Sequence, residues 1–167
     1  FDNKVTFSAG RVSVIELKAT GWKPLLGSGT QADPYLLYNA NDMVSMNGLL
    51  VSGKQTFFKM MADVDMTGID WSPDNQASPY RKDIDFDGDG HAISNFSCTK
   101  SGIYSGFIGV LSGRIANVTF ENPVVEAKSK HSGIICGYAG STGTLPAVVE
   151  NVTIKGGKIT QSANCHT

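Results

Sequence analysis

Apolar and polar positions alternate in a short phrase that occurs three times along the chain. The copies span residues 93–98, 115–120 and 149–154, and each has apolar residues first, fourth and sixth and an asparagine third. Residues two apart point to the same face of a β-strand, so the fourth and sixth residues of each copy form an inward pair. Recurrence of one short strand is typical of stacked repeats, and it predicts a parallel β-helix, or solenoid.

The repeated phrase also predicts which side chains fill the interior. Stacking the copies in register places these residues inside: Ile93, Phe96, Cys98, Ile115, Val118, Phe120, Val149, Val152 and Ile154. The three asparagines, Asn95, Asn117 and Asn151, would then stack at one corner and hydrogen-bond to each other and to the turn backbone. Alternatively, each asparagine makes only its own turn. Their unequal spacing favours one coil per interval, with a longer outward loop in the second.

The region before the first copy predicts three different elements. Alternating apolar residues on both sides of a turn at Ala9-Gly10 predict a β-hairpin over 1–21, and the prolines and glycines of 22–34 predict a linker. Apolar residues three to four apart, with Asn39 or Asn41 as N-cap, predict one helix over 40–51. That helix would cap a coiled domain spanning 35–167, whose first strands we expect at 56–60, 62–66, 83–86 and 91–98.

Size and charge exclude several classes of partner. The chain has 167 residues, 41% of them hydrophobic, which is enough for one domain, or one domain and a fragment of another. A formal net charge of −1 gives no basic field for nucleic acid or an anionic membrane. No apolar run reaches the roughly 20 residues of a membrane span. The chain begins with Phe1, so we expect a mature or trimmed product.

The three cysteines are widely spaced and include no CxxC pair, which argues against a zinc site. Cys98 occupies the slot that Phe120 and Ile154 fill in the other copies, which predicts a small apolar core residue. A Cys98–Cys136 disulfide is the alternative. Cys165 lies in the terminal segment.

Several motifs, in order, resemble bacterial surface proteins with GLUG-type repeats. The matching stretches lie within residues 27–161, at 29–38, 58–66, 69–71, 86–96, 106–110 and 133–138. The resemblance implies a right-handed parallel β-helix on a secreted or outer-surface protein, often linked with adhesion. One departure is Ile134, where a second glycine is commoner. Residues 1–21 separately resemble the terminal hairpin of a fimbrillin-like β-sandwich, which would make them a remnant of a preceding domain.

Asp63 and Asp65 lie on one strand face, roughly 6.5–7 Å apart along the chain. Carboxylates about 6.5–9.5 Å apart serve inverting glycosidases, one as general acid and one as the base that activates water. The alternative is a pair of turn-capping or solvent-facing aspartates beside Thr67-Gly68. The surface-protein family has the same Ala-Asp-hydrophobic-Asp run as a structural feature.

Asp83, Asp85, Asp87 and Asp89 alternate around Gly88 like the start of an EF-hand loop. Alternate aspartates supply the oxygen ligands that calcium requires. However, the twelfth position is Ser94 rather than glutamate, and neither flank reads as a helix. A strand ending in a turn at 87–90 explains the same residues, so calcium remains an alternative and no cofactor is expected.

Trp71 and Tyr80 flank a polar loop at 72–82. Exposed aromatic side chains there could stack on sugar rings or anchor a protein, and they are our predicted binding surface. Alternatively, Trp71 closes the side of the coil.

The sequence thus predicts a mainly β chain: a short right-handed parallel β-helix with one capping helix and an N-terminal β-hairpin. The resemblance to surface proteins with GLUG-type repeats implies a noncatalytic, extracellular adhesion module, whose loops we expect to bind a glycan or a host or bacterial surface protein. The rival hypothesis is a polysaccharide lyase or glycoside hydrolase. No helix or polar strand seals the last coil after Ile159. We therefore expect either a longer protein or edge-to-edge pairing with another copy at the C-terminal coil.

Overall fold

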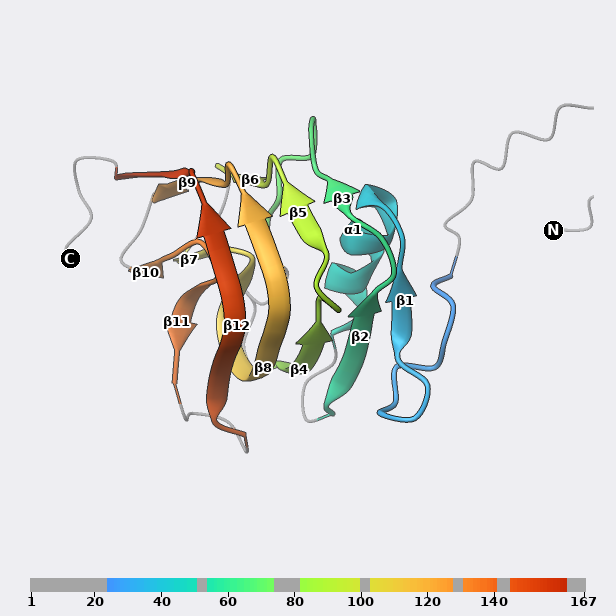
Figure 1. Ribbon diagram of the computed structural model, residues 1–167. Coiled ribbons are helices and arrows are strands. Elements are labelled where there is room, and N and C mark those ends of the chain that lie inside the picture. Colours follow the sequence, from blue (N-terminus) through green and yellow to red (C-terminus); the bar gives the residue numbers. More distant parts are fainter. Residues whose placement is uncertain are drawn as a thin grey trace, which may run out of the picture.

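The computed structural model describes residues 24–50, 54–73, 82–99, 103–127, 131–140 and 145–161 (Figure 1). This part of the chain is mainly β and includes one helix, α1 (Ala40–Leu49). This helix has ten residues. No helix in the described ranges is long and apolar enough to cross a membrane. The predicted hairpin at 1–21, the first two residues of the predicted linker and Tyr80 lie outside the described residues.

One sheet of eight strands runs through the described structure, and its strands lie side by side from β1 to β12 in Figure 1. Every pairing between its strands is parallel. The long strand β8 pairs with β4 along its first half and with β5 near its end, while β12 pairs with its second half. The eight strands are β1 (Tyr35–Leu37), β2 (Thr56–Met60), β3 (Val64–Asp65), β4 (Lys82–Asp87), β5 (Ala92–Ser94), β8 (Ile108–Glu121), β11 (Cys136–Ala139) and β12 (Ala147–Lys155).

Two smaller parallel sheets complete the architecture. One joins β6 (Ser97–Cys98), β9 (Val124–Ala127) and β13 (Lys158–Gln161), and the other joins β7 (Tyr104–Ser105) and β10 (His131–Ser132). Each run of chain therefore stacks on the run before it. We call the runs that carry β4–β6, β7–β9 and β10–β13 successive levels of the stack.

Side chains that alternate along the strands separate the core from the surface. In β2, buried and half-buried residues alternate as Thr56, Phe58 and Met60 point inward. The centre of the core is aromatic: Phe107 stacks on Trp71 with ring centroids 5.6 Å apart and meets Phe86 edge-on at 5.1 Å. The Trp71 indole Nε1–H donates a hydrogen bond to the Phe107 carbonyl at 2.9 Å, so its polar atom is satisfied inside the core.

The predicted helix is confirmed, and it closes the core at the β1 end. Asn39 is the N-cap, because its side-chain oxygen accepts hydrogen bonds from the N–H groups of Asn41 and Asp42. Met43 and Met46, one turn apart, are both fully buried in the core. Beside β1, the Leu36 N–H donates to the Leu26 carbonyl at 2.9 Å in an antiparallel bridge.

The predicted register is right for two copies of the repeated phrase and wrong for the first. Residues 149–154 lie on 115–120 residue for residue. Residues 93–98 are also parallel to this run but are displaced by five positions, so that Ile93 lies beside Phe120 and Cys98 beside Val125. The segment 120–125 carries the same spacing of apolar residues around Asn122, and it is this segment that the first copy matches.

The predicted interior is confirmed for the first two copies, and in the last copy Val152 packs partly buried against the core while Val149 and Ile154 do not. The residues of the first two copies are 0–2% exposed, whereas Val149 is 45% and Ile154 is 42% exposed. Val149 and Ile154 are exposed because they lie in β12, which no further strand covers within the described residues. Cys98 is fully buried, as predicted from its slot, and it carries a thiol separate from that of Cys136. Burial raises the pKa of the Cys136 thiol.

Candidate functional site

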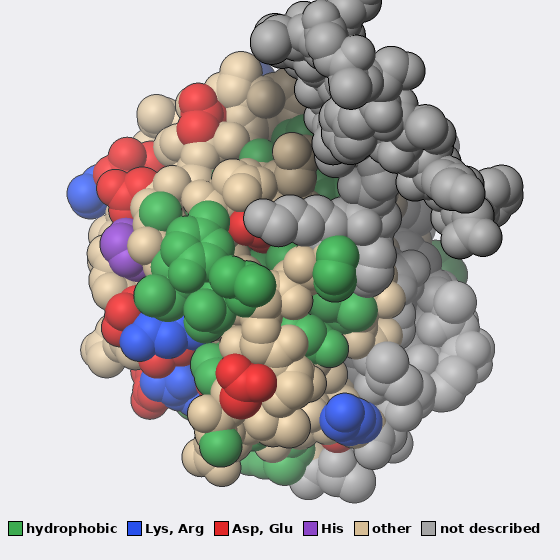
Figure 2. Space-filling view, turned by 90° about the vertical axis from the view of Figure 1, so that its right-hand side faces the viewer, with side chains coloured by type: hydrophobic (Ala, Val, Ile, Leu, Met, Phe, Trp, Pro, Cys, Tyr) green, Lys and Arg blue, Asp and Glu red, His purple; other side chains and the backbone are tan. Residues whose placement is uncertain are grey.

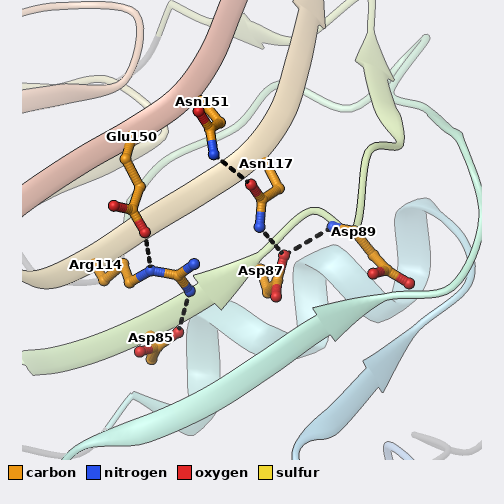
Figure 3. A network of polar contacts seen from close by, with 7 residues as sticks. All are labelled: Asp85, Asp87, Asp89, Arg114, Asn117, Glu150 and Asn151. Carbon is orange, nitrogen blue, oxygen red and sulfur yellow. Dashed lines mark hydrogen bonds and ion pairs between the residues drawn. The ribbon is translucent and has the colours of Figure 1, made fainter.

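The outward face of β4, β8 and β12 carries a row of charged side chains (Figure 3). Because Ile84 and Phe86 point into the core, the alternate residues Asp85 and Asp87 point outward. Arg114 lies between neighbouring strands: its Nη1 is 3.1 Å from Asp85 Oδ1 and its Nε is 2.6 Å from Glu150 Oε1. One guanidinium thus joins three adjacent levels of the stack.

A groove of about 260 Å³ lies beside this row. Its lining residues come from three strands and from the segment that precedes β1: Gln31, Pro34, Phe57, Phe58, Lys59, Asp85, Asp87 and Arg114. Lys59 Nζ lies 3.1 Å from Asp89 Oδ2, which places a second cation at the groove. The groove therefore combines both signs of charge with part of an aromatic ring, a combination suited to a polar ligand with an apolar face.

Hydrogen bonds keep the groove charged. Burial alone would raise the pKa of Asp87, but hydrogen bonds from the Asn117 side chain and the Asp89 N–H outweigh it and lower that pKa. The hydrogen bond to Glu150 raises the pKa of Arg114 above its usual value. Both groups are thus ionised at neutral pH, and the groove presents fixed charges to solvent.

Two of the three asparagines of the predicted ladder, Asn117 and Asn151, hydrogen-bond to each other at the corner next to the groove, whereas Asn95 does not take part. Asn151 donates to Asn117 at 3.1 Å, and Asn117 donates to Asp87 at 2.9 Å, which confirms stacking of two of the three asparagines. Asn95 belongs to another corner, where it donates to Asp65 at 2.9 Å. All three asparagines have positive φ, between 49° and 55°, so each also makes a turn in the left-handed region that asparagine tolerates.

Each of the four aspartates of the predicted calcium alternative has a protein side chain as its partner. Asp83 accepts a hydrogen bond from the Ser112 hydroxyl, Asp85 binds Arg114, Asp87 binds Asn117 and Asp89 binds Lys59. In the described part of the chain, no group of three or more histidines, cysteines, aspartates and glutamates is arranged to hold a metal ion. The observed contacts instead fit the strand-and-turn interpretation of these residues.

Asp63 and Asp65 are surface residues with structural partners. Asp63 Oδ1 accepts from the Ala92 N–H at 2.9 Å and contacts His91 Nδ1 at 3.0 Å. Asp65 Oδ1 accepts from Asn95, and from both the N–H and the hydroxyl of Thr67. These hydrogen bonds, led by those from Ala92 and Asn95 respectively, lower the pKa of both carboxyls. A general acid requires a raised pKa, so the environment does not prepare either residue for that role.

Trp71 is a core residue and is only 2% exposed. Its ring packs between Phe96 and Phe107, which agrees with the alternative that it closes the side of the coil. Tyr80, the other residue of the predicted binding surface, lies outside the described residues.

Sequence reasoning missed the cationic residues of the groove. Arg114 is separated from Asp85 by 29 positions and from Glu150 by 36. Only the strand register brings such distant residues together. The sequence did contain one signal for the outward position of Arg114. Arg114 directly precedes the inward Ile115, and neighbouring residues of a strand point to opposite faces.

Comparison with known proteins places this chain beside two longer proteins. A Bacteroides ovatus protein of known crystal structure, described as a "putative immunoglobulin A1 protease", is 39% identical, with a TM-score of 0.73 over 78% of this chain and 40% of that one. Halomucin of Haloquadratum walsbyi is 28% identical over a match of 144 residues, which covers 78% of this chain and 2% of halomucin. No family model matches the sequence. The chain thus spans less than half the length of either relative. The likeness in fold concerns the Bacteroides ovatus protein, whereas the likeness to halomucin is one of sequence.

Proposed function

We propose that the chain is a noncatalytic binding module of a bacterial cell-surface protein, built as a short right-handed parallel β-helix of the GLUG type. The observation that carries the proposal is the outward row Asp85–Arg114–Glu150 beside the groove. Strands held in register on both sides fix these charges in space, and a fixed array loses little entropy when it binds a partner. The stacked levels act as a rigid support, and the groove contacts a glycan or a surface protein.

The location and division of the chain belong to the same proposal. An extracellular or outer-surface position fits the similarity to halomucin and to the Bacteroides ovatus protein. The proposed division is a hairpin at 1–21 from a fimbrillin-like sandwich, a linker at 22–34 and the capped β-helix at 35–167.

The proposal is tested with a glycan array probed by the intact protein, followed by titration of any glycan retained. Arg114→Ala removes the central cation of the row and should weaken binding at least tenfold, the effect of about 1.4 kcal/mol. Lys155→Ala is the matched control, because Lys155 makes a similar ion pair with Glu121, at 3.1 Å, but does not line the groove. Absence of any retained glycan or protein partner, or equal binding by both variants, would contradict the proposal.

The description of the Bacteroides ovatus protein favours one second candidate, a hydrolase. Incubation with immunoglobulin A1 and with uronic-acid and neutral glycans tests for turnover. Asp65→Asn serves as the control for the paired aspartates. Cleavage that depends on Asp65 would replace the binding module with an enzyme.

A further inference from the structure

Two columns of outward side chains form the charged part of the groove. Residues that pair in register on neighbouring parallel strands point to the same face, so Phe57, Asp85 and Arg114 form one column across β2, β4 and β8. Lys59 and Asp87, two positions further along β2 and β4, form the second column. Phe57 is half-buried and lines the groove, so part of its ring is an apolar surface directly beside these charges.

The charges that line the groove cancel. They are two cations, Lys59 and Arg114, and two carboxylates, Asp85 and Asp87. Each cation already contacts a carboxylate at 3.1 Å, in the pairs Lys59–Asp89 and Arg114–Asp85. On the face shown in Figure 2, basic and acidic side chains likewise lie next to one another, beside a cluster of hydrophobic side chains. A charged ligand would therefore have to compete with an existing ion pair.

Polar atoms for an uncharged ligand remain in the groove. Among the described residues, Asp85 and Asp87 each form their side-chain contacts through Oδ1, and Arg114 donates through Nε and Nη1. Oδ2 of each aspartate is left to accept a hydrogen bond, and Nη2 of Arg114 is left to donate one. A hydroxyl group both donates and accepts. It can thus bond to these atoms without breaking an ion pair.

We infer that the groove binds an uncharged pyranose ring of a glycan, an assignment that rests on the proposed function and narrows the partner to one chemical class. The C–H face of the sugar packs on the exposed part of the Phe57 ring, and its hydroxyl groups bond to Asp85, Asp87 and Arg114. The volume of about 260 Å³ is slightly below the roughly 300–1,000 Å³ of sites for drug-sized ligands, which suits a single ring.

The test compares neutral and acidic sugars on the intact protein. The neutral probes are the methyl glycosides of glucose, galactose, mannose, fucose and N-acetylglucosamine, and the acidic probes are those of glucuronic and galacturonic acid. Nuclear magnetic resonance titration follows the amide signals of β2 and β4. We expect a neutral probe to shift these signals and to bind at least tenfold more tightly than either acid. Its affinity should stay nearly constant between about 0.1 M and about 1 M salt, because salt screens charged ligands.

Four variants assign the contacts. Phe57→Leu keeps an apolar side chain on β2 but removes the flat ring, so it should bind the neutral probe at least tenfold more weakly, whereas Phe57→Tyr keeps the ring and should bind like the wild type. Tyr38→Leu is the matched control, since Tyr38 is an aromatic residue that is 43% exposed but lines a different hollow, and its binding should be unchanged. Asp87→Asn removes a negative charge and an acceptor, so it should weaken binding of the neutral probe. Urea unfolding checks that all four variants fold.

The outcomes separate this assignment from the proposed function. Retention of acidic glycans alone on the array, or binding of a protein partner alone, would overturn the assignment and leave a binding module. So would tighter binding by Asp87→Asn, which is the sign of an anionic ligand, or equal binding by Phe57→Leu and the wild type. Failure of every neutral probe to shift the β2 and β4 amides would also overturn it. Absence of any glycan or protein partner contradicts the proposed function itself.

Discussion

Replacement of Asn117 separates two roles of this residue, namely its left-handed backbone turn and its side-chain hydrogen bonds. Asn117→Gly keeps the left-handed backbone accessible but removes the hydrogen bonds to Asp87 and from Asn151. Each bond contributes about 0.5–1.5 kcal/mol net, and glycine adds about 0.5–1 kcal/mol of lost chain entropy. We therefore expect a loss of about 1.5–4 kcal/mol in the free energy of unfolding. For a domain of this size, that loss lowers Tm by roughly 3–16 °C.

Asn117→Ala tests the backbone term. Alanine removes the same hydrogen bonds but must adopt a φ near 54°, which costs an L-residue without a compensating side-chain contact about 1–2 kcal/mol. The alanine variant should thus be less stable than the glycine variant by about 1 kcal/mol, after allowing for the chain entropy of glycine. Asn151→Gly is the graded control, since Asn151 has a similar φ of 49° but donates a single side-chain bond within the corner.

Urea unfolding followed by far-UV circular dichroism measures all three variants, with unchanged m-values as the sign that the unfolded state is comparable. The reasoning fails if Asn117→Gly matches the wild type in stability. It also fails if the alanine variant is at least as stable as the glycine variant, because the strain of alanine would then do no more than offset the chain entropy of glycine. A loss in Asn151→Gly as large as that in Asn117→Gly would show that the bond to Asp87 is unimportant.

Two further predictions concern the core and the surface carboxylates. Trp71→Phe deprives the buried Phe107 carbonyl of its indole donor. The free energy of unfolding, measured in urea, should fall by about 1–3 kcal/mol. A loss below about 0.5 kcal/mol would contradict the role given to that hydrogen bond. Asp63, Asp65 and Asp87 have lowered pKa values in the folded state. The unfolded chain therefore takes up protons first as the pH falls through the usual aspartate value of 3.8. Stability should be complete above this value and decline below it. Thermal unfolding from pH 7 to pH 3 checks this: Tm should fall below about pH 4, less steeply in Asp65→Asn, and a Tm independent of pH would refute it.

Local patterns predicted the elements because their causes are local. Asn39 caps the helix through N–H groups two and three residues away, and the spacing of Met43 and Met46 marks its buried face. The strands at 56–60 and 115–120 follow from alternation between the core and solvent. Such signals depend on neighbours in the sequence, so the chain itself contains them.

The register depended on a choice between similar segments. Asn95 matches Asn117 in its local phrase. In the structure, however, Asn95 lies beside Asn122, because Ser94 pairs with Glu121. Both asparagines have positive φ, and apolar residues flank both. Local pattern cannot rank two equivalent matches five residues apart. The distance along the chain needed to complete one level decides between them.

The candidate site was harder to predict than the fold for a related reason. Arg114 meets Asp85 and Glu150 only after three strands have aligned, so an error in register displaces every outward contact. Trp71 illustrates the opposite error. Its neighbourhood in the sequence is polar, whereas its neighbours in space are Phe96 and Phe107.

The alternation along β4, β8 and β12 has an evolutionary consequence. Phe86 and Ile115, which hold the fold together, sit one position away from Asp85 and Arg114, which face the groove. Mutations that alter recognition therefore fall on one set of codons, and mutations that threaten folding fall on the interleaved set. A lineage can change its partner by drift at the outward positions while purifying selection preserves the inward ones.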